Sequence, residues 1–596
     1  MTDPSSVSSA GRPYPWPLVA WCMGLAGLVL APLVRPGFLL SYDMVTVPRQ
    51  ELVPDALGLG SALPRAVPLD AVVAVLTQVV PGELVYRVAL VGILAGGALG
   101  AAMLLPHAST TVRVVAASAY VWNAYVAERL VIGHWGLLVA YAVLPWLLRA
   151  GLAVRRGERG SLPTALLLAA LASVTPTGGV LATGVLAVVV ALPGRHRWLA
   201  AWAAAGCVVL QLPWVVPAVL TPTPLTSDPR AVEAFAAHPD SPLGLVGSVL
   251  TLGGIWNSDV VPLSRSLWSA TIVTVAWVGL GLGGVGRLRA TVGWPAMLAL
   301  AGLAALGIVV SLAGTFGGGL GWAVGHVPGA GLLRDGPKFL AWYSLALAPA
   351  AALGAERLAA AVSRWSGGLV SAAVVAGVAA VLPLAALPDL AWGVGGRLSP
   401  VQYPPDWEDV RDALHREPAA GALVVLPYQP YRSFDWNDRR TVLDPLPRYA
   451  GVEYVVPDTL TVGGRRLAGE DPRAAAVAEA LRMPEPRARL LRLGVGWVAV
   501  EHGTPGTVST GLLRELDPVI RGGDLELYRV RGDPVAWQAV APRTPVLAAH
   551  LAALAMAGLS ATWLAVATLT RKGQHSLVQS GQAWLHARAK RSRRIR

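Results

Sequence analysis

Charged residues, cysteine and lysine are all scarce in this chain of 596 residues. Only 14% of the residues are charged, against roughly 25% in an ordinary soluble protein, so a soluble globular protein of this length is excluded. The two cysteines, Cys22 and Cys207, both lie within apolar runs, which excludes a disulfide framework and a thiolate metal site. Only three of the 48 basic residues are lysines, so arginine carries nearly all of the positive charge.

The common motifs of nucleotide and metal chemistry are also absent. The chain contains no Walker A sequence, no nucleotide-binding glycine fingerprint, no His-Glu-x-x-His and no Cys-x-x-Cys. An ATP-driven pump is therefore not expected, and the sequence predicts neither a metal site nor a cofactor. No soluble stretch interleaves a basic patch with aromatic residues, so a nucleic-acid partner is not expected either.

What the chain has in abundance is apolar sequence. Hydrophobic residues make up 54% of it and the mean hydropathy is +0.54. A membrane-spanning helix needs ~20 apolar residues, and runs of about that length occur at 17–40, 84–105, 136–154, 198–220, 292–313, 339–358, 368–390 and 546–569. Shorter or weaker runs occur at 111–125, 162–175, 180–192 and 267–282. The predicted fold is mostly α: a polytopic membrane protein of about twelve transmembrane helices, in which 162–192 is either two spans or a re-entrant hairpin.

Arginine placement predicts the orientation of these helices. Four short loops hold the pairs or triplets Arg155, Arg156 and Arg159; Arg195 and Arg197; Arg287 and Arg289; and Arg357 and Arg364. With an even number of helices, all four loops lie on the same side as the basic tail 571–596. We therefore predict a multi-pass protein of the plasma (inner) membrane with both termini cytoplasmic, and a long first extracytoplasmic loop at 41–83.

The composition changes after the transmembrane domain, which we assign to 1–390. Charged residues return between 391 and 544, where helical stretches at 406–415 and 471–482 alternate with strand-like runs at 422–426, 495–500 and 525–530. This alternation predicts a small extracytoplasmic α/β domain. A last transmembrane helix at 545–570 and the cytoplasmic tail would complete the chain.

The first candidate for chemistry is Asp43, in the loop 41–83. A carboxylate a few residues past a span is costly unless it faces water, a partner or a substrate. The surrounding loop mixes Arg49, Glu51, Asp55 and Arg65 with proline and glycine. Such a composition also suits a solvated interfacial loop, so it does not decide between the two interpretations.

Two further charged clusters are predicted on the same outer face. The segment 122–135 contains Glu128, Arg129 and His134; an aromatic belt with an interfacial Glu–Arg pair is the alternative interpretation. The segment 331–339 contains Arg334, Asp335 and Lys338 just before a span. Two cations and free amides at a helix start favour a phosphate, whereas a structural Arg–Asp pair with a snorkelling lysine is the alternative.

These segments resemble the GT-C class of membrane glycosyltransferases. Within that class, the sequence most resembles actinobacterial α-(1→3)-arabinofuranosyltransferase-like and YfhO-type integral membrane proteins. The resemblance rests on Ser-Tyr-Asp at 41–43 and on the segments 121–135, 333–340, 403–407 and 434–437. Many members of the class carry two acidic residues together at this point, whereas Tyr42 and Met44 flank a single aspartate here.

The resemblance implies an extracytoplasmic glycosyltransferase. Its donor would be a polyprenyl-phosphate-linked sugar, such as arabinofuranose, and its acceptor a cell-envelope glycan or lipid. Asp43 would be the catalytic base, and the substrate-binding residues would be Glu128, Arg129, His134, Arg334, Asp335 and Lys338. The α/β domain would position the glycan through aromatic and polar groups at 428–431 and 434–437, which are equally ordinary in a loop of such a domain.

Two other classes of function remain open on the sequence. A transporter or flippase of a lipid-linked saccharide would use the outer cations as headgroup sites, but spans such as 136–154 and 368–390 contain few ionisable residues, which coupled transporters usually need. A non-catalytic protein of cell-envelope assembly would bind glycan without transferring sugar.

Overall fold

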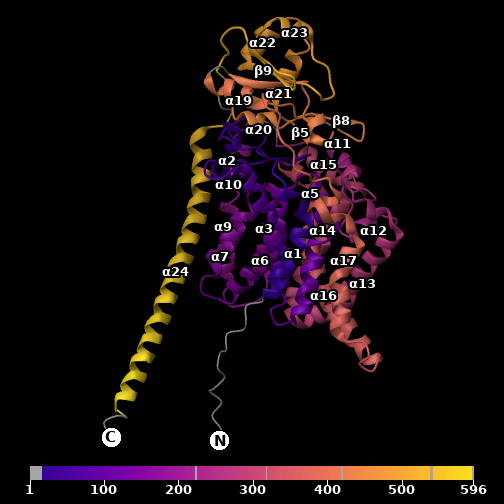
Figure 1. Ribbon diagram of the computed structural model, residues 1–596, viewed down its shortest axis with the longest axis vertical. Helices are drawn as coiled ribbons and strands as arrows, with labels where there is room; N and C mark the ends of the chain where they lie inside the picture. The colour runs from indigo at the N-terminus through magenta and orange to yellow at the C-terminus, as the bar shows by residue number, and fades with distance from the viewer. Residues whose placement is uncertain (1–15, 222–224, 317, 418–420, 537–540, 593–596) are drawn as a thin grey trace.

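The computed structural model describes residues 16–221, 225–316, 318–417, 421–536 and 541–592, with only the backbone described for 571–592. A bundle of helices forms the larger part of the molecule, and a smaller part containing a β-sheet lies at one end of it (Figure 1). Residues 1–15 and the last four residues of the predicted basic tail lie outside the described residues.

Seven described helical segments are long and apolar enough to cross a membrane. Six of them contain α1 (Trp16–Leu30), α3 (Gly82–Met103), α6 (Trp135–Arg155), α13 (Trp268–Val292), α14 (Trp294–Phe316) and α16 (Leu340–Trp365), and the seventh is the part Arg543–Thr570 of α24 (Arg543–Ser592). Two bent pairs raise the number to nine if each pair is a single span: α9 (Arg197–Val209) with α10 (Leu212–Leu220), and α17 (Ala372–Ala386) with the segment Pro388–Gly395. The prediction of a mostly helical, multi-pass membrane protein is confirmed.

The described residues do not confirm the twelve spans predicted. Three helices that contributed to the prediction, α4 (Thr110–Val121), α7 (Ser161–Ala172) and α8 (Pro176–Ala191), contain 12, 12 and 16 residues. Each is shorter than the ~20 residues that cross a bilayer. Gly160 precedes α7 and Pro176 begins α8, so turn-forming residues rather than loss of hydrophobicity limit α7.

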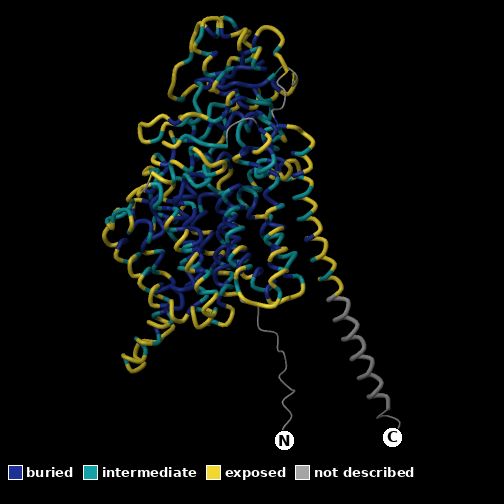
Figure 2. Tube along the Cα trace, turned by 180° about the vertical axis from the view of Figure 1, so that it is seen from behind, coloured by how far each residue is buried: buried dark blue, intermediate teal, exposed yellow. Residues whose placement is uncertain are grey.

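Small residues allow two of the long helices to cross at very short range. A Cβ atom at Gly284 of α13 would lie 1.9 Å from the carbonyl oxygen of Ala350 in α16, and one at Gly354 would lie 1.8 Å from that of Leu280. Close backbone approach through glycine is a common basis of helix association in membranes. The most buried candidate span is α6, near the middle of the bundle, whereas α24 runs down its outside and is the least buried (Figures 1 and 2).

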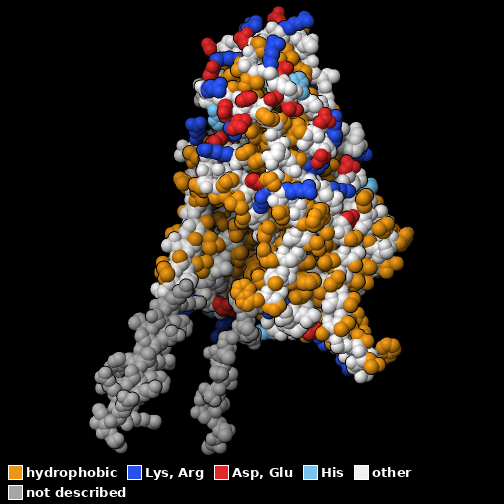
Figure 3. Space-filling model, viewed as in Figure 1, with side chains coloured by type: hydrophobic (Ala, Val, Ile, Leu, Met, Phe, Trp, Pro, Cys, Tyr) orange, Lys and Arg blue, Asp and Glu red, His pale blue; other side chains and the backbone are white. Residues whose placement is uncertain are grey.

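The surface divides the molecule in the same way. Hydrophobic side chains cover the helical bundle, and acidic and basic side chains gather over the end that contains the sheet (Figure 3). The exposed apolar face of the bundle is what a lipid-facing surface requires, because hydrocarbon offers polar groups no hydrogen-bond partners.

The sheet has five strands in the order β10 (Leu516–Arg521), β11 (Leu525–Val530), β9 (Val495–Glu501), β3 (Ala422–Leu426) and β6 (Tyr454–Val455). β9, β3 and β6 are parallel, and β11 and β10 continue the sheet in antiparallel pairing. The three strand-like runs identified in the sequence are β3, β9 and β11. Helix α19 (Asp406–Arg416) covers one face of the sheet, and α21 (Pro472–Ala480) and α22 (Pro486–Arg492) cover the other.

The loop after α1 joins the sheet-bearing part to the bundle. It forms the short hairpin of β1 (Leu40–Ser41) and β2 (Met44–Val45), and then the helix α2 (Leu69–Thr77). Leu40, Val45 and Val47 belong to the same apolar core as Trp407 of α19. Isolated bridges also link Phe38 to Val401 and Tyr42 to Val442. The first loop and the segment 401–450 therefore form one junction, and Asp43 lies within it.

Candidate active site

Asp43 stands at the tip of the turn between β1 and β2. Tyr42, the other turn residue, has φ = 46°, the left-handed conformation that two-residue hairpin turns require. The backbone of Tyr42 is held on both sides: its N–H donates to the Thr441 carbonyl at 2.7 Å, and its carbonyl accepts from the Leu443 N–H at 2.8 Å. The sheet-bearing part of the chain thus fixes the position of the acid.

The segment 122–135 packs directly against this turn. The Asp43 N–H donates to the Ile132 carbonyl at 3.1 Å, and the Ser41 hydroxyl donates to the Val131 carbonyl at 2.7 Å. Gly133 has φ = +83°, and a Cβ atom there would lie 2.0 Å from the backbone nitrogen of Met44. Only glycine permits so close an approach, and the approach places His134 beside Asp43.

Hydrogen bonds connect Arg129, His134, Asp43 and Tyr431. Arg129 directs its Nη1 donor at His134 Nδ1 over 3.4 Å, and His134 Nε2 lies 3.4 Å from Asp43 Oδ2. Because arginine can only donate, Nδ1 accepts and the proton of the neutral imidazole is on Nε2, facing Asp43. The Tyr431 hydroxyl donates to Asp43 Oδ1 at 2.6 Å. Each oxygen of the carboxylate therefore faces one donor.

The third predicted segment lies beside the same group. Asp335 Oδ2 lies 3.2 Å from Lys338 Nζ and 3.6 Å from Arg129 Nη1. The Tyr125 hydroxyl donates to the Lys338 carbonyl at 2.8 Å. Asp335 and Arg129 are buried, but the Lys338 side chain is 23% exposed. Lys338 lies in the 3₁₀ turn Gly336–Phe339 that leads into α16, so it belongs to a helix start, as predicted for this segment.

The pKa values of these side chains determine which of them are charged near neutral pH. Burial opposes ionisation of Asp43, but the hydrogen bonds from His134 and Tyr431 and the charge of Lys338 outweigh it, and the pKa of Asp43 is lowered. Burial, Lys338 and Arg129 lower the pKa of His134, against the opposing effect of Asp43. Burial also opposes ionisation of Asp335, yet Lys338 and Arg129 lower its pKa to about 2. The site therefore pairs an ionised aspartate with a neutral histidine.

Asp43 keeps access to the surface despite these contacts. Its side chain is 39% exposed, and that of His134 is 14% exposed. A carboxylate with free lone pairs, an open side and a cation nearby can accept a proton from a bound hydroxyl group. The arrangement suits acid–base chemistry on a substrate that also carries negative charge.

Arg334 points to a different partner from Lys338. Its Nη1 lies 3.0 Å from Glu470 Oε1, and its guanidinium stacks over the Phe235 ring at 5.4 Å. The other oxygen of Glu470 pairs with Arg65. The two cations predicted to act together, Arg334 and Lys338, are thus paired to separate acids, Glu470 and Asp335.

Glu128 interacts with a different set of residues from Asp43. It is buried beside Asp240, whose Oδ1 lies 2.6 Å from Arg265 Nη2. Burial and the neighbouring Asp240 raise the pKa of Glu128 well above its usual value. The interfacial Glu–Arg pair considered from the sequence does not form, because Arg129 turns to Asp335 instead.

Sequence reasoning did not foresee the role of two residues. Tyr431 was considered only for sugar contact, and nothing in the local pattern around Glu470 indicates that it joins Arg65 to Arg334. By contrast, Phe434 and Trp436 stack on each other and pack with Trp407, so the aromatic rings at 434–437 belong to the core under α19. Within the described residues, no group of three or more His, Cys, Asp and Glu side chains could hold a metal ion.

Comparison with solved structures reveals a related fold. The cryo-EM structure of arabinofuranosyltransferase AftD from mycobacteria matches 87% of this chain with a TM-score of 0.53 and 18% sequence identity. A mutant of the same enzyme matches 86% of the chain with a TM-score of 0.53 and 17% identity. This chain covers 40% and 42% of those two chains, less than half of their length. No protein-family model matches the sequence, and a search of curated proteins finds no match.

Proposed function

We propose that this protein is a membrane glycosyltransferase that transfers a sugar from a polyprenyl-phosphate donor to a cell-envelope glycan or lipid. The observation that carries the proposal is the partly exposed Asp43 carboxylate, held between the hydroxyl of Tyr431 and the imidazole of His134 and close to Lys338. The likeness in fold to an arabinofuranosyltransferase supports the reaction class and suggests arabinofuranose as the sugar.

In the proposed reaction, Asp43 acts as the general base. The acceptor hydroxyl attacks the anomeric carbon of the donor, a new C–O bond forms, and the bond from that carbon to the phosphate oxygen breaks. The electron pair of the broken bond leaves with the polyprenyl phosphate, and the hydroxyl proton passes to Asp43. His134 and Tyr431 hold the carboxylate in place for this step.

Lys338 is the residue we assign to the departing phosphate. It is the partly exposed cation of the Asp43 group, whereas Arg129 is buried with only 1% of its side chain exposed. A positive charge placed where negative charge develops lowers the barrier. Arg129 and Asp335 would then orient His134 and Lys338, and Arg334 with Arg65 would form a second, more distant anion contact.

We further propose that this junction faces the extracytoplasmic side and that the arginine-rich loops and both termini are cytoplasmic. The support is the arginine asymmetry of the short loops. Cysteines introduced at the exposed positions Gly523 and Pro193 should react oppositely with an impermeant thiol reagent in intact cells. Cys22 and Cys207 are buried and should stay unlabelled. Equal labelling of the two sites would overturn the orientation.

The substitution Asp43→Asn tests the reaction itself. A general base contributes roughly 10²–10⁴-fold to the rate, so transfer from a polyprenyl-phosphate sugar in proteoliposomes should fall by about that factor. The amide keeps the shape of the side chain, so folding and donor binding should survive.

Two neighbouring acids serve as matched controls. Glu51 pairs with Arg49 at 3.0 Å, and burial with the charges of Asp471 and Glu453 raises the pKa of Asp55 to about 7. Glu51→Gln and Asp55→Asn should each leave most of the transfer rate intact. A fully active Asp43→Asn enzyme would refute the assignment, and a parent protein that transfers no lipid-linked sugar would favour transport or binding.

A further inference from the structure

A cavity of about 640 Å³ lies at the end of the bundle opposite Asp43. Its walls come from the last residues of α3, the last turns of α6, the start of α7 and the middle of α24. Helix α6 begins next to His134 and contains 21 residues, so the cavity is roughly 20–30 Å from the candidate active site at 1.5 Å per residue. It is therefore a separate site.

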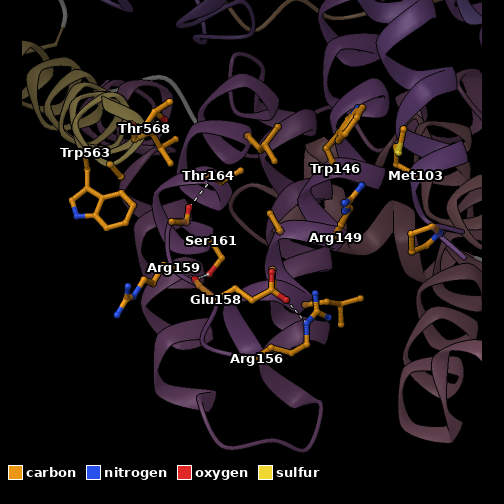
Figure 4. Close-up of a pocket in the computed structure, with 18 of the residues that line it drawn as sticks. Met103, Trp146, Arg149, Arg156, Glu158, Arg159, Ser161, Thr164, Trp563 and Thr568 are labelled. Carbon is orange, nitrogen blue, oxygen red and sulfur yellow. Dashed lines mark hydrogen bonds and ion pairs between the residues drawn. The ribbon is translucent and has the colours of Figure 1, made fainter. Parts of the chain in front are cut away.

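The polar wall of this cavity is basic. Arg149, Arg156 and Arg159 line it together with one acid, Glu158 (Figure 4). Glu158 pairs with Arg156. In the described part of the chain, neither Arg149 nor Arg159 has an ion-pair partner. Arg149 also lies close enough to Arg113 of α4 for the two positive charges to repel each other. A bound anion would relieve this repulsion.

The opposite wall is apolar and comes largely from two elements. Trp563, Leu564 and Ala567 of α24 line it together with Leu168 of α7. Trp563 and Thr568 project from α24 toward the cavity in Figure 4. Because α24 runs down the outside of the bundle and is the least buried candidate span (Figure 1), this side of the cavity lies at the periphery of the bundle. A ligand there meets both cations and hydrocarbon.

We propose that this cavity binds the phosphate headgroup of an anionic glycerophospholipid, with its acyl chains against α24 and α7. The two unpaired arginines complement the negative charge of the phosphate. Because part of the wall is apolar, a fully hydrated anion would fit the cavity less well than a lipid. Basic pockets between transmembrane helices are known headgroup sites, and the volume lies within the usual 300–1,000 Å³ of ligand pockets. The bound lipid would hold α24, which follows the sheet in the chain, against the bundle.

The test uses the full-length protein in detergent micelles. Binding of dioleoyl phosphatidylglycerol is measured by native mass spectrometry and by thermal unfolding, with dioleoyl phosphatidylcholine and inorganic phosphate as the other arms. Arg149→Gln with Arg159→Gln should weaken phosphatidylglycerol binding roughly thirty-fold, because each arginine near an anionic lipid contributes about 1 kcal/mol. Lysine at both positions should restore most of the binding.

A charge-matched control is Arg195→Gln with Arg364→Gln. Both arginines are exposed at the same end of the bundle, and neither lines the cavity. For Arg195, this location follows from the hydrogen bond that Arg155 donates to the nearby Leu192 carbonyl. This control should bind phosphatidylglycerol within about twofold of the parent. Equal losses in the two double variants would mean non-specific attraction and would overturn the site.

Two further outcomes would also overturn the proposal. If phosphatidylcholine binds the parent as tightly, or if inorganic phosphate stabilises it as much as phosphatidylglycerol does, the ligand is not an anionic lipid. Should the glutamine double variant fail to fold, Ala567→Trp provides an independent test. It keeps every charge but fills the cavity from α24, and undiminished phosphatidylglycerol binding by this variant would refute the proposal.

Discussion

Two groups of charged residues lie near each other in the sheet-bearing end of the molecule. They differ in their exposure to solvent and in how far apart their residues lie in the sequence. Arg432 pairs with Asp444 Oδ2 at 2.8 Å and with Glu501, and the three side chains are at most 5% exposed. All three belong to the segment 432–501. The Asp43 group draws residues from four segments that are far apart in the chain, and Asp43 itself is 39% exposed.

The two groups also shift their acids in opposite directions. Burial raises the pKa of Asp444 and raises that of Glu501 well above its usual value, although Arg432 opposes both effects. In the Asp43 group, donors and cations outweigh burial, so the pKa of Asp43 and that of Asp335 are lowered. A buried charge cluster can stabilise the fold or specify it. A solvent-exposed cluster with an ionised acid can contact a substrate.

The largest effect that we expect from this comparison concerns the buried group. Arg432→Met should lower the free energy of unfolding by roughly 3–5 kcal/mol, because it leaves two buried carboxyl groups without their cation. Transfer activity per folded molecule should be unchanged. Urea unfolding of the full-length protein in detergent measures the loss. Arg439→Met is the control, since that side chain is 60% exposed, and a similar loss there would contradict the comparison.

The next largest effect concerns the pH dependence of the transfer rate, on its acid limb, where the rate falls as pH decreases. Tyr431→Phe removes one donor from the Asp43 carboxylate, which destabilises its charged form and raises its pKa. The acid limb of the transfer rate should therefore move to higher pH, by about one pH unit for the loss of ~1.4 kcal/mol. Tyr428→Phe is the control, because that hydroxyl donates to the Ala474 carbonyl. An unmoved limb in Tyr431→Phe would place the base elsewhere.

A smaller effect should separate the two predicted phosphate cations. Lys338→Gln should weaken donor binding by about tenfold, on the scale of one charge-assisted hydrogen bond. Arg334→Gln should weaken it less, because Arg334 already pairs with Glu470 and stacks on Phe235. Titration of each variant with a polyprenyl-phosphate sugar gives the two affinities. The reverse order would mean that the Arg334–Glu470 pair opens to receive the phosphate.

The last prediction is that the transfer rate does not change between about pH 7 and pH 8.5. The pKa of Asp43 and that of His134 both lie below their usual values of about 3.9 and 6.5, so both groups have already lost their protons at pH 7. Burial and Asp43 raise the pKa of Tyr431 well above its usual value, so it keeps its proton. Steady-state transfer rates across this range should be level, and a clear base-side rise would point to another acid or base.

Much of the local structure could be read from the sequence. Long apolar runs identify most of the membrane helices because a helix that meets lipid must be apolar around most of its surface. The runs at 422–426, 495–500 and 525–530 are strands, since their branched and aromatic residues suit a buried pleated sheet. The helix start near Lys338 was predicted from the sequence, and the three-residue spacing from Asp335 to Lys338 lets that pair form locally.

Local patterns were a poor guide to length and to partners. The runs containing α4, α7 and α8 are apolar enough for spans, but capping and turn residues end the helices early. Arg129 could have paired with the adjacent Glu128 in sequence, yet Asp335 is its partner in space. Phe434 looked available for a sugar and is buried in the core.

The sequence alone therefore determined that this is a mostly helical membrane protein with an acid directly after its first long apolar run. It also determined which segments hold the cations. Only the tertiary structure decided that the Tyr431 hydroxyl, 388 residues along the chain, binds Asp43, and that Glu470 holds Arg334, 136 residues away. Helix and strand periodicity reports neighbours a few residues apart, whereas contacts over such separations depend on how the two parts of the chain pack, and this packing built the junction around Asp43.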